Sequence, residues 1–324
     1  MRARVLAAGV PAFQVRSGHV TTHYCPPNLV WEYREAHALA AAGVEVLVGP
    51  VRSVIPLAHT DVVFASSQNL AIAAQHVADE LGVPWACRLI VPPAPQDGRA
   101  QTEQDEALVA LLDTAAAIVF PSIWLRDAWA SRLVGVSATR EVVPHAIEAE
   151  EAPSFRRRVA PAALFLGWLV ERKRADVVLR CCKAAGVPLT IAGDGPERAG
   201  LVQLAAGLDA AVAFAGIVDE DTKARLFYSH GLYVSASEED YFAIPVGEAL
   251  AAGCRVLHRR LPALVGVWDD SGVEWWDAEE ELVTLLRERR VAVAGAGALW
   301  LIEHSYDVKA VGWRLAAVLR DVVG

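Results

Sequence analysis

The chain has 324 residues, which at roughly 100–200 residues per domain predicts two domains. Its 30 Lys and Arg residues against 39 Asp and Glu residues give a net charge of −9, so a nucleic acid or anionic lipid partner would need a local basic patch. Apolar residues make up 54% and charged residues 21%, a composition that excludes a disordered chain. Apolar runs are shorter than the ~18 residues that span a bilayer, and the N-terminus lacks a credible signal-peptide cleavage site, so we expect a soluble, cytoplasmic protein.

The five cysteines show neither the density of a disulfide scaffold nor a C-x-x-C spacing: they are Cys25, Cys87, Cys181, Cys182 and Cys254. We expect reduced, partly buried thiols. No acidic D-x-D pair stands at the end of a predicted strand, so we predict no metal site.

Short apolar runs alternate with helical patterns along the first half, which is typical of β-α-β units and a parallel sheet. Strands are predicted over 4–9, 44–48, 61–65, 84–91, 116–121 and 140–143. Helices are predicted over 29–42, 70–81, 101–115 and 124–133. The stretch 11–28 is predicted to be irregular, and loops of this length are usually functional or disordered.

The pattern breaks over 144–161, which contains the run Arg156–Arg158 and is predicted to be an inter-domain linker. A second set of units follows. Its predicted strands are 163–166, 189–192, 212–214, 232–235 and 255–257. Its predicted helices are 175–185, 196–206, 219–228, 247–252, 278–286 and 308–323. Two α/β halves are therefore expected, with a ligand at the carboxyl ends of their strands.

Gly193-Asp194-Gly195-Pro196 follows an apolar strand and opens a helix. This arrangement lets a backbone approach a phosphate and directs a helix N-terminus towards it. The spacing is not G-x-G-x-x-G, however, and a tight turn with proline at the helix start explains the four residues equally well. A dinucleotide-dependent oxidoreductase is an alternative that depends on these glycines.

Acidic residues gather in the segment 235–250, where a strand end leads through an apolar loop into a helix. Carboxylates in this position are suited to accept hydrogen bonds from sugar or ribose hydroxyls. The amides of Ala243 and Ile244, with the dipole of the following helix, are suited to hold phosphate oxygens. The structural alternative is a capped helix start with solvated acids.

Four motifs in order carry a resemblance that covers roughly 163–258. They are Gly167-Trp-Leu-Val-Glu-Arg-Lys173, Gly193-Asp-Gly-Pro196, Phe214-Ala-Gly-Ile-Val218 and Ser237-Glu-Glu-Asp-Tyr-Phe-Ala-Ile-Pro-Val-Gly-Glu248. This region resembles the nucleotide-sugar domain of the retaining glycosyltransferases of family four. The resemblance implies the GT-B fold, in which two Rossmann-like domains face a cleft. The expected domains are 1–148, on the acceptor side, and 149–306, which binds the nucleotide sugar, with a final helix over 307–324 that packs back on the first domain.

The resemblance also implies roles for individual residues. Lys173 is expected to bind the donor diphosphate, Asp240 to contact the donor sugar hydroxyls, and Glu248 to contact the ribose hydroxyls. The backbone amides over 242–244 are expected at the diphosphate, and the base is expected near 216–218. Besides Lys173, Asp240 and Glu248, the full set of residues expected at the donor is Gly167, Arg172, Gly193, Gly216, Ile217, Val218, Phe242, Ala243 and Ile244.

The chain departs from the family pattern at several positions. Trp168 stands where the family has a phosphate-binding arginine, a loss that Arg172 or Arg174 is conjectured to offset. Asp240 replaces a glutamate and has one methylene less reach. Ile90 stands where a sugar-site histidine is often found, and the family's G-G loop before the first helix is missing from the sequence. These changes leave the sugar open and are compatible with a specialised or inactive member.

The expected activity is retaining transfer of a sugar from a UDP- or GDP-type donor to a hydroxyl acceptor, without a metal or other cofactor. The acceptor is expected to be a saccharide, a small molecule or a natural product, with His19, His23 and His145 as acceptor-side candidates. For each histidine the alternative is an exposed or packed side chain. A modified base in DNA or tRNA is the alternative acceptor. Alternative functions are a GT-B epimerase or phosphorylase and a non-catalytic nucleotide-sugar-binding protein.

Overall fold

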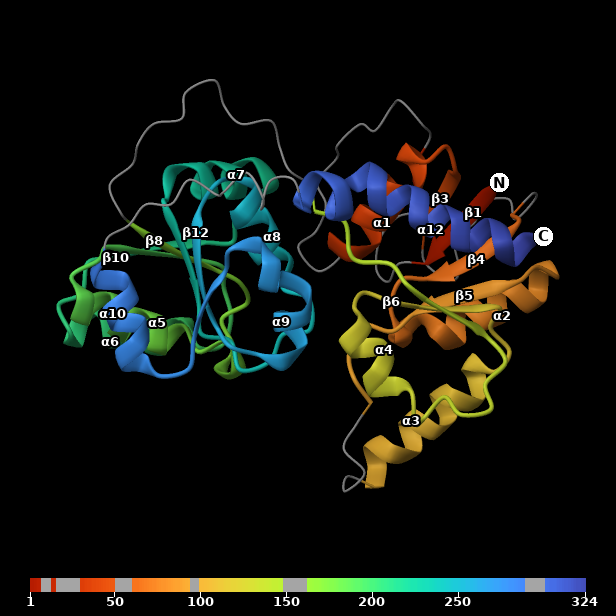
Figure 1. The fold of residues 1–324 in the computed structure, drawn as a ribbon, viewed down its shortest axis with the longest axis horizontal. Coiled ribbons are helices and arrows are strands. Elements are labelled where there is room, and N and C mark those ends of the chain that lie inside the picture. Colours follow the sequence, from red (N-terminus) through yellow and green to blue (C-terminus); the bar gives the residue numbers. More distant parts are fainter. Residues whose placement is uncertain (7–12, 16–29, 50–59, 94–98, 148–161, 289–300) are drawn as a thin grey trace. The chain divides into compact units, whose positions relative to one another are not determined.

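The structure, a computed structural model, describes residues 1–6, 13–15, 30–49, 60–93, 99–147, 162–288 and 301–324. The chain forms two compact units, one of Met1–Ala146 with Ser305–Gly324 and one of Ile147–His304. The predicted linker lies almost entirely outside the described residues, as do His19 and His23. Each unit contains one sheet flanked by helices, which confirms the predicted α/β class (Figure 1).

The first unit has a seven-stranded sheet in the order β2-β3-β1-β4-β5-β6-β7. The strands are β1 (Arg2–Leu6), β2 (Phe13–Val15), β3 (Glu45–Gly49), β4 (Val62–Ala65), β5 (Trp85–Arg88), β6 (Ala117–Phe120) and β7 (Thr139–Val142). The flanking helices are α1 (Val30–Ala41), η1 (Gln68–Leu70), α2 (Ala71–Leu81), α3 (Arg99–Leu112), α4 (Ile123–Trp129) and α12 (Val308–Val323). All strand pairs are parallel except β2 with β3. Strands β4, β5 and β6 are buried along their whole length, as expected for strands covered on both faces.

The second unit has a six-stranded, fully parallel sheet in the order β10-β9-β8-β11-β12-β13. The strands are β8 (Ala163–Leu166), β9 (Leu189–Ala192), β10 (Val212–Gly216), β11 (Leu232–Ser235), β12 (Arg255–Arg259) and β13 (Glu274–Trp276). The helices are η2 (Glu171–Lys173), α5 (Ala175–Ala185), α6 (Arg198–Gly207), α7 (Glu220–Ser229), α8 (Ile244–Ala251), α9 (Pro262–Trp268), η3 (Asp269–Ser271) and α10 (Glu279–Arg287). Helices α5, α6 and α10 lie side by side and close the core of this unit (Figure 1).

Several elements differ from the sequence prediction, and four of them have a clear reason in the sequence. Strand β2 lies inside the stretch 11–28 that was predicted to be irregular, because three residues are too few to show an alternating pattern. Helix α9 and strand β13 were not predicted, since α9 has only seven residues and β13 only three. Helix α8 begins at Ile244 instead of 247, because Pro245 fits the first helical turn.

Helix α12 packs against α1 in the first unit, so the last residues of the chain complete the core that begins with β1 (Figure 1). Val311, Leu315 and Leu319 of α12 are buried in this core. Gly312 lies so close to α1 that an added Cβ would overlap the carbonyl oxygen of Ala38. The two helices therefore approach each other at a position where a side chain has no room.

Within the described ranges, every helix is too short or too polar to cross a bilayer.

Substitution Gly312→Ala should destabilise the protein by about 1–3 kcal/mol, because the new methyl group forces α1 and α12 apart. Gly200→Ala is the matched control, since Gly200 lies in α6 with open space around it. The control should stabilise the protein slightly, by up to ~1 kcal/mol, through helix propensity alone. Urea unfolding of both variants provides the measurement, and equal behaviour of the two would contradict the close α1–α12 contact.

Candidate functional site

The four sequence motifs meet at one edge of the second unit's sheet. Gly167 follows β8, Gly193 follows β9, Gly216 ends β10, and the acidic segment 236–242 follows β11. Because all these strands are parallel, their carboxyl ends lie on the same edge. This is the edge at which open α/β sheets bind ligands. The structure thus places residues far apart in the sequence around one candidate site.

The two glycines of Gly193-Asp-Gly-Pro196 are required by close backbone packing. The Gly193 N–H donates to the Gly216 carbonyl at 2.7 Å, and the Leu169 N–H donates to the Asp194 carbonyl at 2.8 Å. A Cβ on Gly193 would overlap the carbonyl oxygen of Gly167, and a Cβ on Gly195 would overlap that of Leu169. The loops after β8, β9 and β10 therefore form one hydrogen-bonded layer, which favours the tight-turn interpretation of this motif.

Lys173 and Asp240, 67 residues apart in the sequence, form an ion pair between the loop after β8 and the loop after β11. The Lys173 ammonium donates to both Asp240 carboxylate oxygens at 2.7 Å. The two side chains are only 20% and 19% exposed. A backbone hydrogen bond of 2.8 Å from the Glu238 N–H to the Arg172 carbonyl holds the two segments in register. The cation expected at the diphosphate and the acid expected at the sugar are thus in direct contact.

Two neighbouring arginines are also paired with acids of the same loop. Arg172, half exposed, donates to the Glu239 carbonyl at 3.2 Å. Arg174 donates to Asp176 and, at 2.5 Å, to Glu238, and the hydrogen bond to Asp176 raises the pKa of the Arg174 guanidinium. These pairs place guanidinium groups beside the loop after β11.

Two exposed residues of these loops are apolar, and one of them stands where the family resemblance expects an arginine. Trp168 is 57% exposed beside the glycine turn, and Ile217 is 61% exposed just after β10. Gly216, before Ile217, has φ +68°, a backbone conformation that favours glycine. The loops after β8 and β10 therefore each expose one large apolar side chain.

The start of α8 is fixed by a strained residue and a buried ring. Ala243, the N-cap, has φ 55° and ψ 68°, which is the left-handed region. The indole N–H of Trp268 donates to the Phe242 carbonyl at 2.7 Å, and the two rings pack edge to face. The first amides of a helix lack intrahelical acceptors, so the start of α8 is suited to an anion. The chain holds this start in place at the cost of backbone strain.

Glu248 is buried in the second turn of α8 with 6% exposure. Lys223 of α7 donates to its Oε1 atom at 2.8 Å and is itself only 14% exposed. Sequence reasoning missed Lys223, because its position in a polar helix gave no signal that it would reach another helix.

His258 is a second residue that sequence reasoning missed. It lies at the end of β12, opposite Ser235 in the register, and is fully buried. Its Nδ1 atom is 2.7 Å from the Arg259 carbonyl, and its Nε2 atom has no hydrogen-bond partner among the described residues. Burial lowers the pKa of His258, on which the charges of Asp240 and Lys173 also act, so a neutral imidazole lies near the Lys173–Asp240 pair.

His145, the one acceptor-side candidate among the described residues, is buried in the first unit with 2% exposure. Its Nδ1 atom is 4.0 Å from Oε1 of Glu35, and the carboxylate of Glu35 is ion-paired with the buried Arg88. Burial, together with the charges of Arg88 and Arg34, holds the pKa of His145 well below its usual range. These surroundings favour the packed alternative for this histidine.

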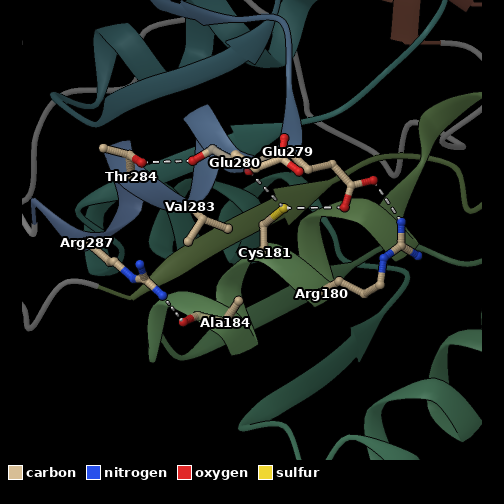
Figure 2. A pocket seen from close by; sticks show the side chains of 8 residues that line it. All are labelled: Arg180, Cys181, Ala184, Glu279, Glu280, Val283, Thr284 and Arg287. Carbon is tan, nitrogen blue, oxygen red and sulfur yellow. Dashed lines mark hydrogen bonds and ion pairs between the residues drawn. The ribbon is translucent and has the colours of Figure 1, made fainter.

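A pocket between α5 and α10 lies away from the motifs (Figure 2). Its two arginines are engaged, Arg180 with Glu279 at 3.1 Å and Arg287 with the Ala184 carbonyl at 3.1 Å. Burial and the nearby Glu279 raise the pKa of the Cys181 thiol to about 12, so this group is not a thiolate at neutral pH. The pocket therefore offers neither a nucleophile nor an uncommitted cation. The cysteines of the described residues are all buried and unpaired, namely Cys87, Cys181, Cys182 and Cys254.

Replacing Ala243 by glycine should stabilise the protein by up to ~1 kcal/mol. Glycine removes the left-handed penalty of about 1–2 kcal/mol but adds entropy to the unfolded chain. The control Ala251→Gly, at the right-handed end of the same helix, should destabilise by about 1 kcal/mol. Thermal unfolding of both variants tests this, and destabilisation of the same size in both would show that Ala243 is not strained.

Comparison with known proteins gives a family for part of the chain. Residues 160–272 match the family model described as "Glycosyl transferases group 1". No curated protein sequence matches the chain.

Solved structures resemble the chain more widely, at low sequence identity. HepE from Anabaena, in complex with UDP and glucose, superposes with a TM-score of 0.72 at 13% identity over 99% of this chain and 100% of that protein. Sucrose-phosphate synthase from Thermosynechococcus elongatus gives a TM-score of 0.74 at 14% identity over 99% and 98%. A variant of S. aureus TarM superposes with a TM-score of 0.66 at 10% identity, over 80% of this chain and 55% of TarM. The chain therefore spans about half the length of that relative.

The similarity to complete solved chains confirms the predicted GT-B fold. The family match covers the second unit from just before β8 to just after η3, which is the region that holds the candidate site. Together the family match and the fold support a glycosyltransferase.

Proposed function

We propose that the protein is a retaining glycosyltransferase that moves a sugar from a nucleoside diphosphate sugar to a hydroxyl acceptor. The observation that supports this most is the contact of Lys173 with Asp240 at the carboxyl edge of the second sheet. A cation for a phosphate and a carboxylate for sugar hydroxyls lie side by side there. The pair belongs to the region that matches the glycosyltransferase model.

The diphosphate of the donor would be bound by Lys173 and by the start of α8. An ammonium group binds phosphate oxygens as a point charge, and the helix dipole adds positive potential at its N-terminus. The strained Ala243 fixes the direction of this helix start. UDP is the first nucleotide to test, because the HepE and TarM complexes contain it, and GDP is the alternative.

The sugar would take the place of Lys173 on Asp240. Without a donor, each group of the pair satisfies the charge of the other. When the diphosphate engages Lys173, the Asp240 oxygens become acceptors for sugar hydroxyls, so the total number of charge-assisted hydrogen bonds is maintained. The short side chain of Asp240 keeps the sugar close to the sheet edge.

In the proposed reaction the anomeric carbon breaks its bond to the β-phosphate oxygen and forms a bond to the acceptor oxygen on the same face. The acceptor proton goes to the leaving diphosphate, so no protein base is required. Lys173 and the start of α8 stabilise the charge that develops on the diphosphate, which is electrostatic catalysis by fixed groups. We propose that neither a metal nor another cofactor takes part.

The acceptor is proposed to be a hydroxyl of a saccharide, a small molecule or a natural product. His19 and His23 remain acceptor-side candidates outside the described residues. We propose the cytoplasm as the location, in keeping with the unpaired cysteines of the described residues.

A second candidate, a non-catalytic nucleotide-sugar-binding protein, is favoured by Trp168, which supplies no charge where the family resemblance expects an arginine. It would bind the donor without turnover. Hydrolysis or transfer of a bound donor sugar, measured as release of nucleoside diphosphate, separates the two candidates.

Substitution Lys173→Met should weaken binding of UDP or GDP by at least ~10-fold, because a charge-assisted hydrogen bond to phosphate is lost. Binding of the corresponding nucleoside, which has no phosphate, should change little. Isothermal titration calorimetry gives both affinities. The control is Lys183→Met, an exposed lysine of α5 that contacts the Asp209 carbonyl. Equal diphosphate affinity in the Lys173 variant and the wild type would place the diphosphate elsewhere.

Substitution Asp240→Asn should lower the rate of sugar transfer by at least ~10²-fold while the affinity for the nucleoside diphosphate stays within a few-fold. The neutral amide cannot replace a carboxylate on the sugar, but it leaves Lys173 available to the phosphates. The matched control is Glu239→Gln, the adjacent acid, whose side chain is 48% exposed. NMR of the product gives both the rate and the anomeric configuration. An unchanged rate would remove Asp240 from the site, and an inverted product would overturn the proposed mechanism.

A further inference from the structure

Lys223 is a buried cation of the candidate site that the motifs do not include. It lies in the first turn of α7, where Asp219 caps the helix by accepting from the Thr222 N–H at 2.8 Å. The Lys223 N–H donates to the Asp219 carbonyl at 2.8 Å, so its backbone is fixed by this cap. The ammonium group reaches Glu248 of α8 at 2.8 Å and also contacts Glu220.

The two carboxylates that share this ammonium differ in burial. Glu220 is 47% exposed and keeps much of its hydration, whereas Glu248 is 6% exposed. A buried carboxylate is costly unless a cation or hydrogen-bond donors compensate it. Glu248 therefore depends on Lys223 far more than Glu220 does. Burial, followed by the charges of Asp240 and Glu248, raises the pKa of Tyr233 in β11.

The Lys223–Glu248 pair joins two parts of the proposed nucleotide site. Helix α7 starts two residues after the segment 216–218, where the base is expected. Glu248, four residues into α8, is where the ribose is expected. An ion pair between these helices fixes the position of the carboxylate relative to the base-binding segment.

We propose that Lys223 is a positioning residue that holds Glu248 ionised and oriented, so that the site selects a ribonucleoside diphosphate over its 2′-deoxy form. An ionised carboxylate only accepts hydrogen bonds, so both hydroxyls of a ribose can donate to it, whereas a 2-deoxyribose has one hydroxyl fewer to donate. Loss of the ammonium would favour protonation or rotation of Glu248 and remove this match. The inference rests on the proposed function, in which Glu248 contacts the ribose.

The test compares the affinity for UDP and 2′-deoxy-UDP, and for GDP and 2′-deoxy-GDP, by calorimetry on the full chain. The wild type should prefer the ribose form of its nucleotide by about tenfold. The Lys223→Met variant should bind the ribose form about tenfold more weakly than the wild type does, and its affinity for the deoxy form should fall less. The preference for ribose should therefore drop to within about twofold. Lys223→Arg should restore most of the preference, because the cation is restored.

The matched control is Arg225→Met, which removes an exposed cation of the same helix that contacts Thr222 Oγ1. It should leave both affinities unchanged. If circular dichroism shows that the Lys223→Met variant is unfolded, the Lys223→Gln variant replaces it. Glutamine keeps a hydrogen-bond donor without the charge, and this variant should show the same loss of the ribose preference.

The outcomes separate this inference from the proposed function. A wild type that binds neither UDP nor GDP would overturn the proposed function and this inference with it. If the wild type binds UDP or GDP and the Lys223→Met variant keeps the same ribose preference, the role of Lys223 alone is overturned. An equal loss for ribose and deoxyribose forms would show a general structural effect and would also overturn it.

Discussion

The ion pair between Lys173 and Asp240 joins the two chain segments on which the donor site depends. One segment follows β8 and the other follows β11, strands that are adjacent in the sheet. The pair costs little in the absence of a ligand, because each charge is compensated within a partly buried environment. It also keeps both groups ready for a ligand that carries phosphate and hydroxyl groups. A second ion pair of this kind joins α7 and α8, where Lys223 compensates Glu248.

Close backbone packing at glycines and one strained residue fix the loops around these charged groups. The loops after β8, β9 and β10 pack so closely that Gly193 and Gly195 have no room for a side chain. On the other side, Ala243 takes a left-handed conformation to start α8, and Trp268 fixes the preceding carbonyl. The charged groups therefore lie between two stretches of backbone with little freedom, as electrostatic preorganisation requires.

Much of this could be predicted from the sequence, because the alternation of strands and helices fixes a parallel sheet and the motifs follow its strands. The meeting of Lys173 with Asp240 is a consequence of that topology. The contact of Lys223 with Glu248 could not be predicted, since it depends on which faces of α7 and α8 meet. The place of His258 near the Lys173–Asp240 pair depends on the pairing of β12 with β11, which the sequence pattern does not specify. Short elements such as β13 carry too few residues for a periodic signal. The low pKa of His145 depends on its burial and on the charges of Arg88 and Arg34, which are distant from it in the sequence.

The central claim is that the carboxyl edge of the second sheet binds a nucleoside diphosphate sugar, and ligand-induced stabilisation tests it most directly. Thermal unfolding of the purified protein would be measured with UDP-, GDP-, ADP- and dTDP-sugars, with NAD as the control. A ligand that binds the folded state raises the melting temperature through mass action. We predict a selective rise with one ribonucleotide sugar, UDP- or GDP-linked, and none with NAD. No shift with any nucleotide sugar, or a shift with NAD alone, would contradict the account.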